Sequence, residues 1–177
     1  MMDCDRLDYI KSVTDKGDER EWAYPAEYIG SEFKLNFKRS KGVESHAWKL
    51  PKGSLIILSQ VPHECKNNTT VEQKKIPGGC KKRYLTHVVE LVNEGSEDEP
   101  KWGEGMWDVF RCVKVHWIAD LKNWNSIPVD KEVIRAKWGC YNTCAKSLSS
   151  PKLMSEWGTI DRLRERLIEQ LNLKAIE

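Results

Sequence analysis

The sequence has no long apolar run, because none of its hydrophobic stretches approaches the roughly 20 residues that a membrane-spanning helix needs. We therefore expect no membrane partner. The first residues, MMDCDRLDYIKS, are polar and acidic, unlike the apolar centre of a secretory signal. Six cysteines without such a signal predict reduced thiols and a cytoplasmic protein.

Familiar catalytic motifs are also missing. The sequence contains no Ser–His–Asp order, no P-loop, no GxGxxG and no HExxH. His87 and His116 fall in candidate strands, where we expect them to be packed rather than catalytic. The chain is therefore expected not to be an enzyme by itself.

The cysteine and histidine spacing does not favour a metal centre. Structural zinc sites usually show two close pairs of ligands. Here one group is His63, Cys65 and Cys80, and the other is the distant pair Cys140 and Cys144. We expect buried or loop thiols, no bound metal and no cofactor.

The composition is that of an ordinary globular protein. Apolar residues make up 40% of the 177 residues and charged residues 32%, so we expect one domain over residues 1–177. Its core is expected over roughly 33–172, with an N-terminal helical or looped extension over 1–32. A net charge of +2 neither requires nor excludes nucleic acid, because clustering of charge matters more there.

Hydrophobic patterning predicts several strands with helices at both ends. Strands are predicted at 33–38, 54–61, 83–93 and 108–118, and helices at 3–13, 131–137, 151–157 and from 160 onwards. The 83–93 strand is apolar on both faces, which predicts a central position. Asp130 and Thr159 are expected to cap the helices that follow them. The segments 39–45, 62–82 and 139–149 are expected to be irregular.

This order of elements excludes two common architectures. The strands are too irregularly spaced for an immunoglobulin-like sandwich, and too few strand–helix units alternate for a doubly wound sheet. We predict an α+β fold: a small, partly open β-barrel with packed helices.

The stretch from Lys101 to Asp120, KWGEGMWDVFRCVKVHWIAD, contains three of the eight tryptophans. Glycines between Trp102 and Trp107 place these two in a loop, and the β-forming residues that follow predict a strand carrying Trp117. A loop that presents two flat side chains suits a flat ligand. Trp117 is expected to be core, whereas Trp102 and Trp107 are open to both a binding and a structural role.

This stretch resembles the YTH and EVE domains of the PUA-like superfamily. In YTH domains, two tryptophans in a loop precede a strand that ends in Trp, followed by a polar segment ending in Pro. Here Trp102-x4-Trp107 leads into DVFRCVKVHWIADLKNWNSIP. Upstream, LPKGSLIILSQV and YLTHVVELV occupy the places of the two preceding barrel strands, and Trp48 resembles the third aromatic residue of the YTH pocket.

The resemblance implies a PUA-like fold that recognises a modified base in DNA or RNA, such as N6-methyladenine or 5-methylcytosine. The short 40–48 connection and the long 62–82 insertion point to bacterial and archaeal relatives. There, such domains are the specificity modules of McrB-type modification-dependent restriction systems. The implied partners are methylated DNA or RNA and a fused or associated AAA+ motor or nuclease, which would supply any enzymatic activity.

Recognition of one methyl group needs an enclosing pocket, because burying a methylene-sized group is worth only about 0.8 kcal/mol. Stacking on aromatic side chains adds roughly 1–3 kcal/mol per base, once the base has been flipped out of the duplex. The candidate base-binding residues are Trp48, Trp102, Trp107, Ser40, Ser59 and Gln60. The candidate backbone-binding residues are Lys38, Arg39, Lys41, Lys81, Lys82 and Arg83, for which a solvated basic surface is the alternative.

Two other functions stay open. ASCH-type relatives of this fold hydrolyse RNA or modified nucleosides with a lysine and a carboxylate, and Lys114 with Glu90 would fit if their strands are adjacent. The third possibility is a non-catalytic interaction domain whose aromatic pocket is structural.

Overall fold

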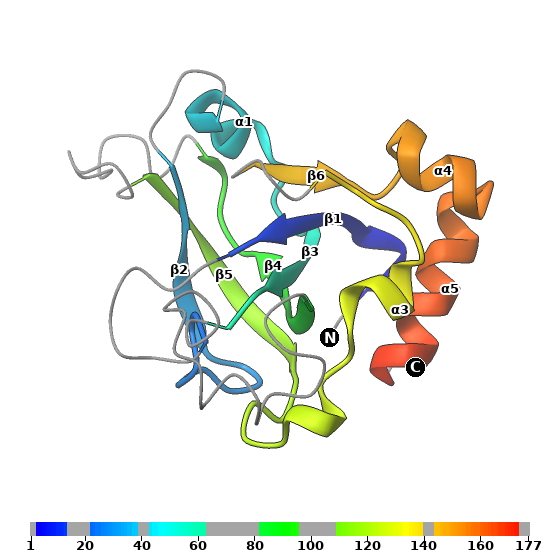
Figure 1. Ribbon diagram of the computed structural model, residues 1–177. Coiled ribbons are helices and arrows are strands. Elements are labelled where there is room, and N and C mark those ends of the chain that lie inside the picture. Colours follow the sequence, from blue (N-terminus) through cyan, green and yellow to red (C-terminus); the bar gives the residue numbers. More distant parts are fainter. Residues whose placement is uncertain are drawn as a thin grey trace.

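A six-stranded mixed sheet, curled into a half-barrel, forms the centre of the computed structural model (Figure 1). The structure describes residues 3–13, 22–38, 43–62, 82–95, 109–139 and 144–173, without the side chains of 43–45. The strands are β1 (Leu7–Ser12), β2 (Glu32–Phe37), β3 (Leu55–Gln60), β4 (Tyr84–Leu91), β5 (Val109–Ile118) and β6 (Ala145–Ser147). Their order is β2-β5-β4-β3-β1-β6, and only the β1–β3 pair is parallel. The expected α+β fold with a partly open barrel is confirmed in this general form.

The helices pack around the sheet at different places (Figure 1). They are α1 (Val43–Lys49), α3 (Asp130–Ile134), α4 (Pro151–Trp157) and α5 (Ile160–Leu171), with 3-10 helices η1 (Cys4–Arg6) and η6 (Trp124–Ser126). Helix α5 lies where a helix was predicted from residue 160 onwards, and it buries Leu163, Leu167 and Leu171 on the face that packs on the sheet. Thr159 caps this helix as expected, since its hydroxyl accepts a hydrogen bond from the Arg162 amide at 3.4 Å.

Strand β4 lies inside the sheet between β5 and β3, and this confirms the central position predicted from its two apolar faces. Leu85 and Val88 join the core beneath α3, α4 and α5. Val89 and Leu91 face the second apolar cluster, which α1 covers. The sheet therefore separates two hydrophobic cores. No helix among the described ranges is long and apolar enough to cross a membrane.

The helix expected over residues 3–13 is wrong, because residues Leu7–Ser12 form strand β1. Leu7 and Ile10 are both fully buried in the core beneath α5, although they are three residues apart. A strand would normally turn them to opposite faces. An irregularity in the β1–β3 pairing between Leu7 and Tyr9 shifts the register and returns Ile10 to the face of Leu7. Two apolar residues three positions apart on one face are typical of a helix, which is why a helix was predicted here.

Four further expectations need correction. Helix α1 begins inside the segment 39–45 and strand β6 lies within 139–149, two segments that were expected to be irregular. Both are short elements whose partners are distant in sequence. Helix α3 ends at Ile134 rather than residue 137, because Arg135 adopts a left-handed conformation with φ of 58°. Asp130 is not the cap, since Val129 occupies that position and the Asp130 carboxylate is turned inward.

The predictions that His87 and Trp117 are packed on the central strands hold. His87 is fully buried, and its Nε2 lies 3.1 Å from the carbonyl oxygen of Tyr24. Trp117 is half-buried and packs against two of the apolar clusters, as expected for a core residue on a strand.

Candidate nucleic-acid interface

Trp48 lies in the last turn of α1 and keeps 40% of its surface exposed, whereas its neighbour Ala47 is completely buried. Arg111, buried on β5, holds this end of the helix in place. Its guanidinium donates hydrogen bonds to the carbonyl oxygens of Ala47 at 2.9 Å and Leu50 at 2.8 Å, with a longer contact of 3.5 Å to Trp48. It also donates to the carbonyl of Asn93, just after β4. The planar guanidinium of Arg111 therefore ties the end of α1 that carries Trp48 to β5 and to the chain after β4.

The segment that carries Trp102 and Trp107 begins directly against Trp48. A Cβ atom on Gly95 would lie 2.1 Å from the carbonyl oxygen and 2.4 Å from Cδ1 of Trp48, so only glycine allows this approach. The same segment re-enters the sheet at Val109, two residues before Arg111 on β5. Trp102 and Trp107 lie outside the described residues, but both chain ends leading to them lie beside α1.

Lys38 belongs to the same end of the sheet. It directly follows β2, whose last residue Phe37 pairs with Val109 at the start of β5. Ser40, Arg39 and Lys41 lie outside the described residues, in the short connection that leads from Lys38 to α1. Among the described cations that were predicted to contact the nucleic-acid backbone, Lys38 is therefore the one at the same end of the sheet as Trp48.

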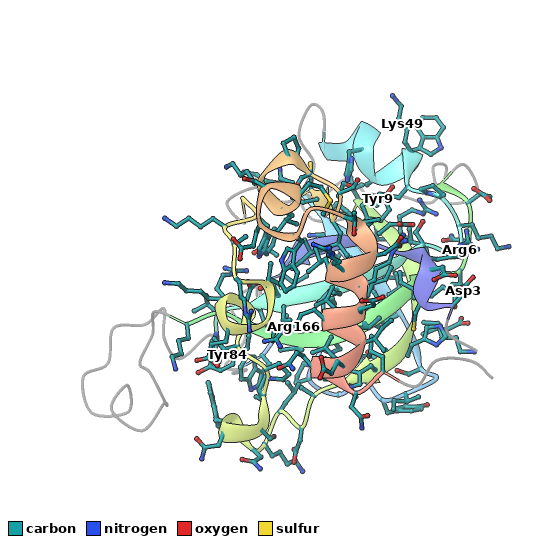
Figure 2. The ribbon with its side chains drawn as sticks, turned by 90° about the vertical axis from the view of Figure 1, so that its right-hand side faces the viewer. Asp3, Arg6, Tyr9, Lys49, Tyr84 and Arg166 are labelled. Atoms are coloured by element: carbon teal, nitrogen blue, oxygen red, sulfur yellow. The ribbon has the colours of Figure 1, made fainter. Side chains whose placement is uncertain are left out.

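Ser59, Gln60, Lys82 and Arg83 lie at the other end of the sheet. Residues 82 and 83 precede β4 and Asn93 follows it, and the eight residues of β4 span about 25 Å at roughly 3.3 Å per residue. Lys49, next to Trp48, and Tyr84, next to Arg83, lie far apart in Figure 2. The structure therefore separates these predicted site residues from Trp48. Lys81 is outside the described residues.

The side chains of Ser59 and Gln60 are buried and make hydrogen bonds inside the protein. The Gln60 amide oxygen accepts from the Ala23 amide at 2.7 Å, and its nitrogen donates to the Thr86 hydroxyl at 2.7 Å. The Ser59 hydroxyl donates to Asp130 at 2.5 Å. Both side chains thus support the fold at this end of the sheet, about one strand length from Trp48.

A buried polar network around Asp130 was not predicted from the sequence. The Asp130 carboxylate also accepts from Nε1 of Trp138 at 2.9 Å, and Arg83 donates to the Ser59 backbone carbonyl and to the Ser12 hydroxyl. Burial raises the pKa of Asp130, against the hydrogen bonds from Ser59 and Trp138 and the charge of Arg83. The only sequence signal was an aspartate at a helix start, which is more often a cap.

Glu90 and Lys114 lie directly opposite each other on β4 and β5, so the adjacency required by the hydrolase alternative is present. The Glu90 carboxylate is also 2.5 Å from Nε2 of His116, whose side chain is mostly buried. Within the described parts of the chain, no group of three or more His, Cys, Asp or Glu residues is arranged to hold a metal ion.

Comparisons of the chain with family models, with curated proteins and with solved structures gave no match.

Proposed function

We propose that this chain is a PUA-like domain of the YTH/EVE type that recognises a modified base in nucleic acid. The flipped base would be held by Trp48, Trp102 and Trp107, which we call the tryptophan cage. One observation carries the proposal: the exposed Trp48 lies against Gly95, where the segment with the other two tryptophans begins. That segment ends at Val109, close to the arginine that fixes Trp48.

The geometry around Trp48 suits discrimination of a small methyl group. A methyl adds only about 0.8 kcal/mol by transfer, so the pocket must hold its walls in place before the base arrives. Arg111 supplies this rigidity, because it binds backbone carbonyls of α1 and of the chain after β4 at once. Stacking of roughly 1–3 kcal/mol per base then offsets the few kcal/mol needed to flip the base.

Backbone phosphates would be bound near the tryptophan cage by Lys38, together with Arg39 and Lys41 in the connection that follows it. Lys82 and Arg83 are about a strand length away and have no part in this proposal. As in the bacterial and archaeal systems that the sequence resembles, the domain would supply specificity. A fused or associated AAA+ motor or nuclease would cut the nucleic acid.

The test is a fluorescence titration with methylated and unmethylated oligonucleotides, each as single-stranded DNA, duplex DNA and RNA. We expect tighter binding of at least one methylated form. Trp48→Ala should abolish this preference while the protein unfolds cooperatively as before, because Trp48 keeps 40% of its surface exposed. Trp124→Ala is the matched control, since Trp124 packs against Trp22 in another apolar cluster. If no oligonucleotide shows a methyl preference, base recognition is excluded.

The second candidate is an ASCH-like hydrolase of RNA or modified nucleosides, favoured by the direct pairing of Glu90 with Lys114. Turnover of such a substrate, lost in Glu90→Gln and in Lys114→Met, would favour it over the reader. Absence of both turnover and methyl preference would leave a non-catalytic interaction domain.

A further inference from the structure

A cavity of about 660 Å³ lies at the end of the sheet opposite to Trp48. Its walls come from the residues before β4, from α3 with the turn that follows it, and from the start of α4. Six basic side chains line it, namely Lys82, Arg83, Lys131, Arg135, Lys137 and Lys152. Among the described residues of the lining, two carboxylates, Asp130 and Glu132, oppose them, which leaves an excess of four positive charges there.

The carboxylates and two of the cations are already engaged with other groups. Asp130 accepts from Ser59 and Trp138, and Arg83 donates to the Ser12 hydroxyl and to Ser59. Glu132 lies 3.9 Å from Lys82.

The other four cations are exposed: Lys131, Arg135, Lys137 and Lys152. Across the described ranges, none of them makes an ion pair within 4 Å. Like charges gathered in one concave site repel one another, and they raise the local concentration of an anion.

The turn after α3 brings two of these cations, Arg135 and Lys137, to the cavity and adds an apolar wall. Arg135 adopts the left-handed conformation that ends the helix, and the chain then passes through Ala136 and Lys137 to Trp138. Trp138 is 5% exposed and is anchored by its hydrogen bond to Asp130. Together with Val129 and Ala136 it gives the cavity an apolar side.

The volume of the cavity and its basic and apolar walls restrict the class of ligand that it can bind. Pockets for small organic ligands measure roughly 300–1,000 Å³, so this cavity has room for far more than one phosphate ion. An apolar ligand would leave the four cations unpaired, and a metal cation would meet them as like charges. A small organic molecule with several negative charges would pair with these cations and pack against the apolar side of the cavity.

We propose that this cavity binds a nucleoside di- or triphosphate. The phosphates lie among the four unpaired cations, and the nucleoside packs toward Trp138. The site is separate from the tryptophan cage and does not depend on base recognition there.

The test is a calorimetric titration of the full chain with ATP, pyrophosphate and adenosine. We expect saturable ATP binding with a Kd below about 1 mM, weaker binding of pyrophosphate and none of adenosine. Added salt should weaken ATP binding, because the site is partly open to solvent.

Charge variants are expected to change the affinity for ATP in both directions. Lys137→Gln and Lys152→Gln should each weaken ATP binding by about three- to tenfold, whereas Glu132→Gln should strengthen it by a similar factor. Lys49→Gln is the control, because Lys49 lies at the far end of the molecule (Figure 2) and should change nothing.

Three results would overturn the proposal. The first is a lack of saturable ATP binding, and the second is ATP affinity that does not change in a Lys131→Gln/Lys137→Gln double variant. The third is oligonucleotide binding that weakens in Lys137→Gln, in a protein that does not bind ATP. That result would show that the cavity binds nucleic acid instead.

Discussion

The guanidinium of Arg111 donates a hydrogen bond to the backbone carbonyl of Ala47 across 2.9 Å, although the two residues are 64 positions apart. This contact joins the buried middle of the sheet to the helix that presents Trp48. Carbonyls near a helix C-terminus lack partners within the helix and carry partial negative charge, so a buried cation there stabilises the helix end.

Arg111→Met should lower the free energy of unfolding by at least about 2 kcal/mol, because it leaves the buried carbonyls of Ala47 and Leu50 without these donors. Urea unfolding at neutral pH measures the loss. The matched control is Arg162→Met on the exposed face of α5, which should change stability by no more than about 0.5 kcal/mol. Equal stability of the two variants would contradict the role of Arg111.

Gly95→Ala should disturb the position of Trp48. The new methyl group would lie 2.1 Å from the Trp48 carbonyl oxygen, and backbone cannot move aside as a flexible side chain can. We expect a loss of about 1–3 kcal/mol and an altered tryptophan emission spectrum.

Gly30→Ala is the comparison for this variant, since a Cβ there meets no atom within 4 Å and the residue has φ of 92°. It should cost about 1–2 kcal/mol from backbone conformation alone, with an unchanged spectrum. An unchanged spectrum in Gly95→Ala would show that the contact with Trp48 is not maintained in solution.

The stability of the protein should fall as the pH falls from about 6.5 to about 4 because of His87. Burial lowers the pKa of this histidine from 6.5 to about 4, and the hydrogen bond to the Tyr24 carbonyl opposes the shift only in part. Between these values the unfolded chain binds a proton that the native protein does not. The free energy of unfolding therefore decreases through this window, by about 3 kcal/mol for the full shift.

His87→Gln keeps a polar side chain but does not titrate there. Urea unfolding at several pH values should show a smaller loss of stability toward acid in this variant than in the parent protein. If both lose stability in parallel across the window, another group is responsible for the acid sensitivity.

The strands that the sequence predicted have either a run of β-forming residues, as in β3, β4 and β5, or alternating apolar and polar residues, as in β2. β3 begins with four apolar residues in a row and five of the eight residues of β4 are apolar, so burial of both faces of these strands was predictable from their composition. β1 was missed because a local register shift brings Leu7 and Ile10 to one face. β6 has only three residues, and its pairing with β1 across more than 130 positions leaves no local signal.

In the candidate site, too, the sequence showed the features that depend on neighbouring residues, but not the contacts between residues far apart in the chain. An aromatic residue near the end of α1 and a tryptophan pair in a glycine-containing loop are local features, and the sequence displays them directly. The hydrogen-bond partners of Ser59 and Arg83 depend on which segments lie side by side in the sheet, which no local pattern contains. The contact of Ser59 with Asp130 spans 71 positions and depends on that same arrangement.

Strand β1 lies inside the sheet, hydrogen-bonded to β3 on one side and to β6 on the other. During synthesis, residues 7–12 leave the ribosome early, while their partners at 55–60 and 145–147 follow much later. The first strand must therefore wait with both edges unpaired until most of the chain is present. Pairing over such distances in sequence slows folding and exposes intermediates to aggregation, so this domain should fold late and as one unit rather than progressively from its N-terminus.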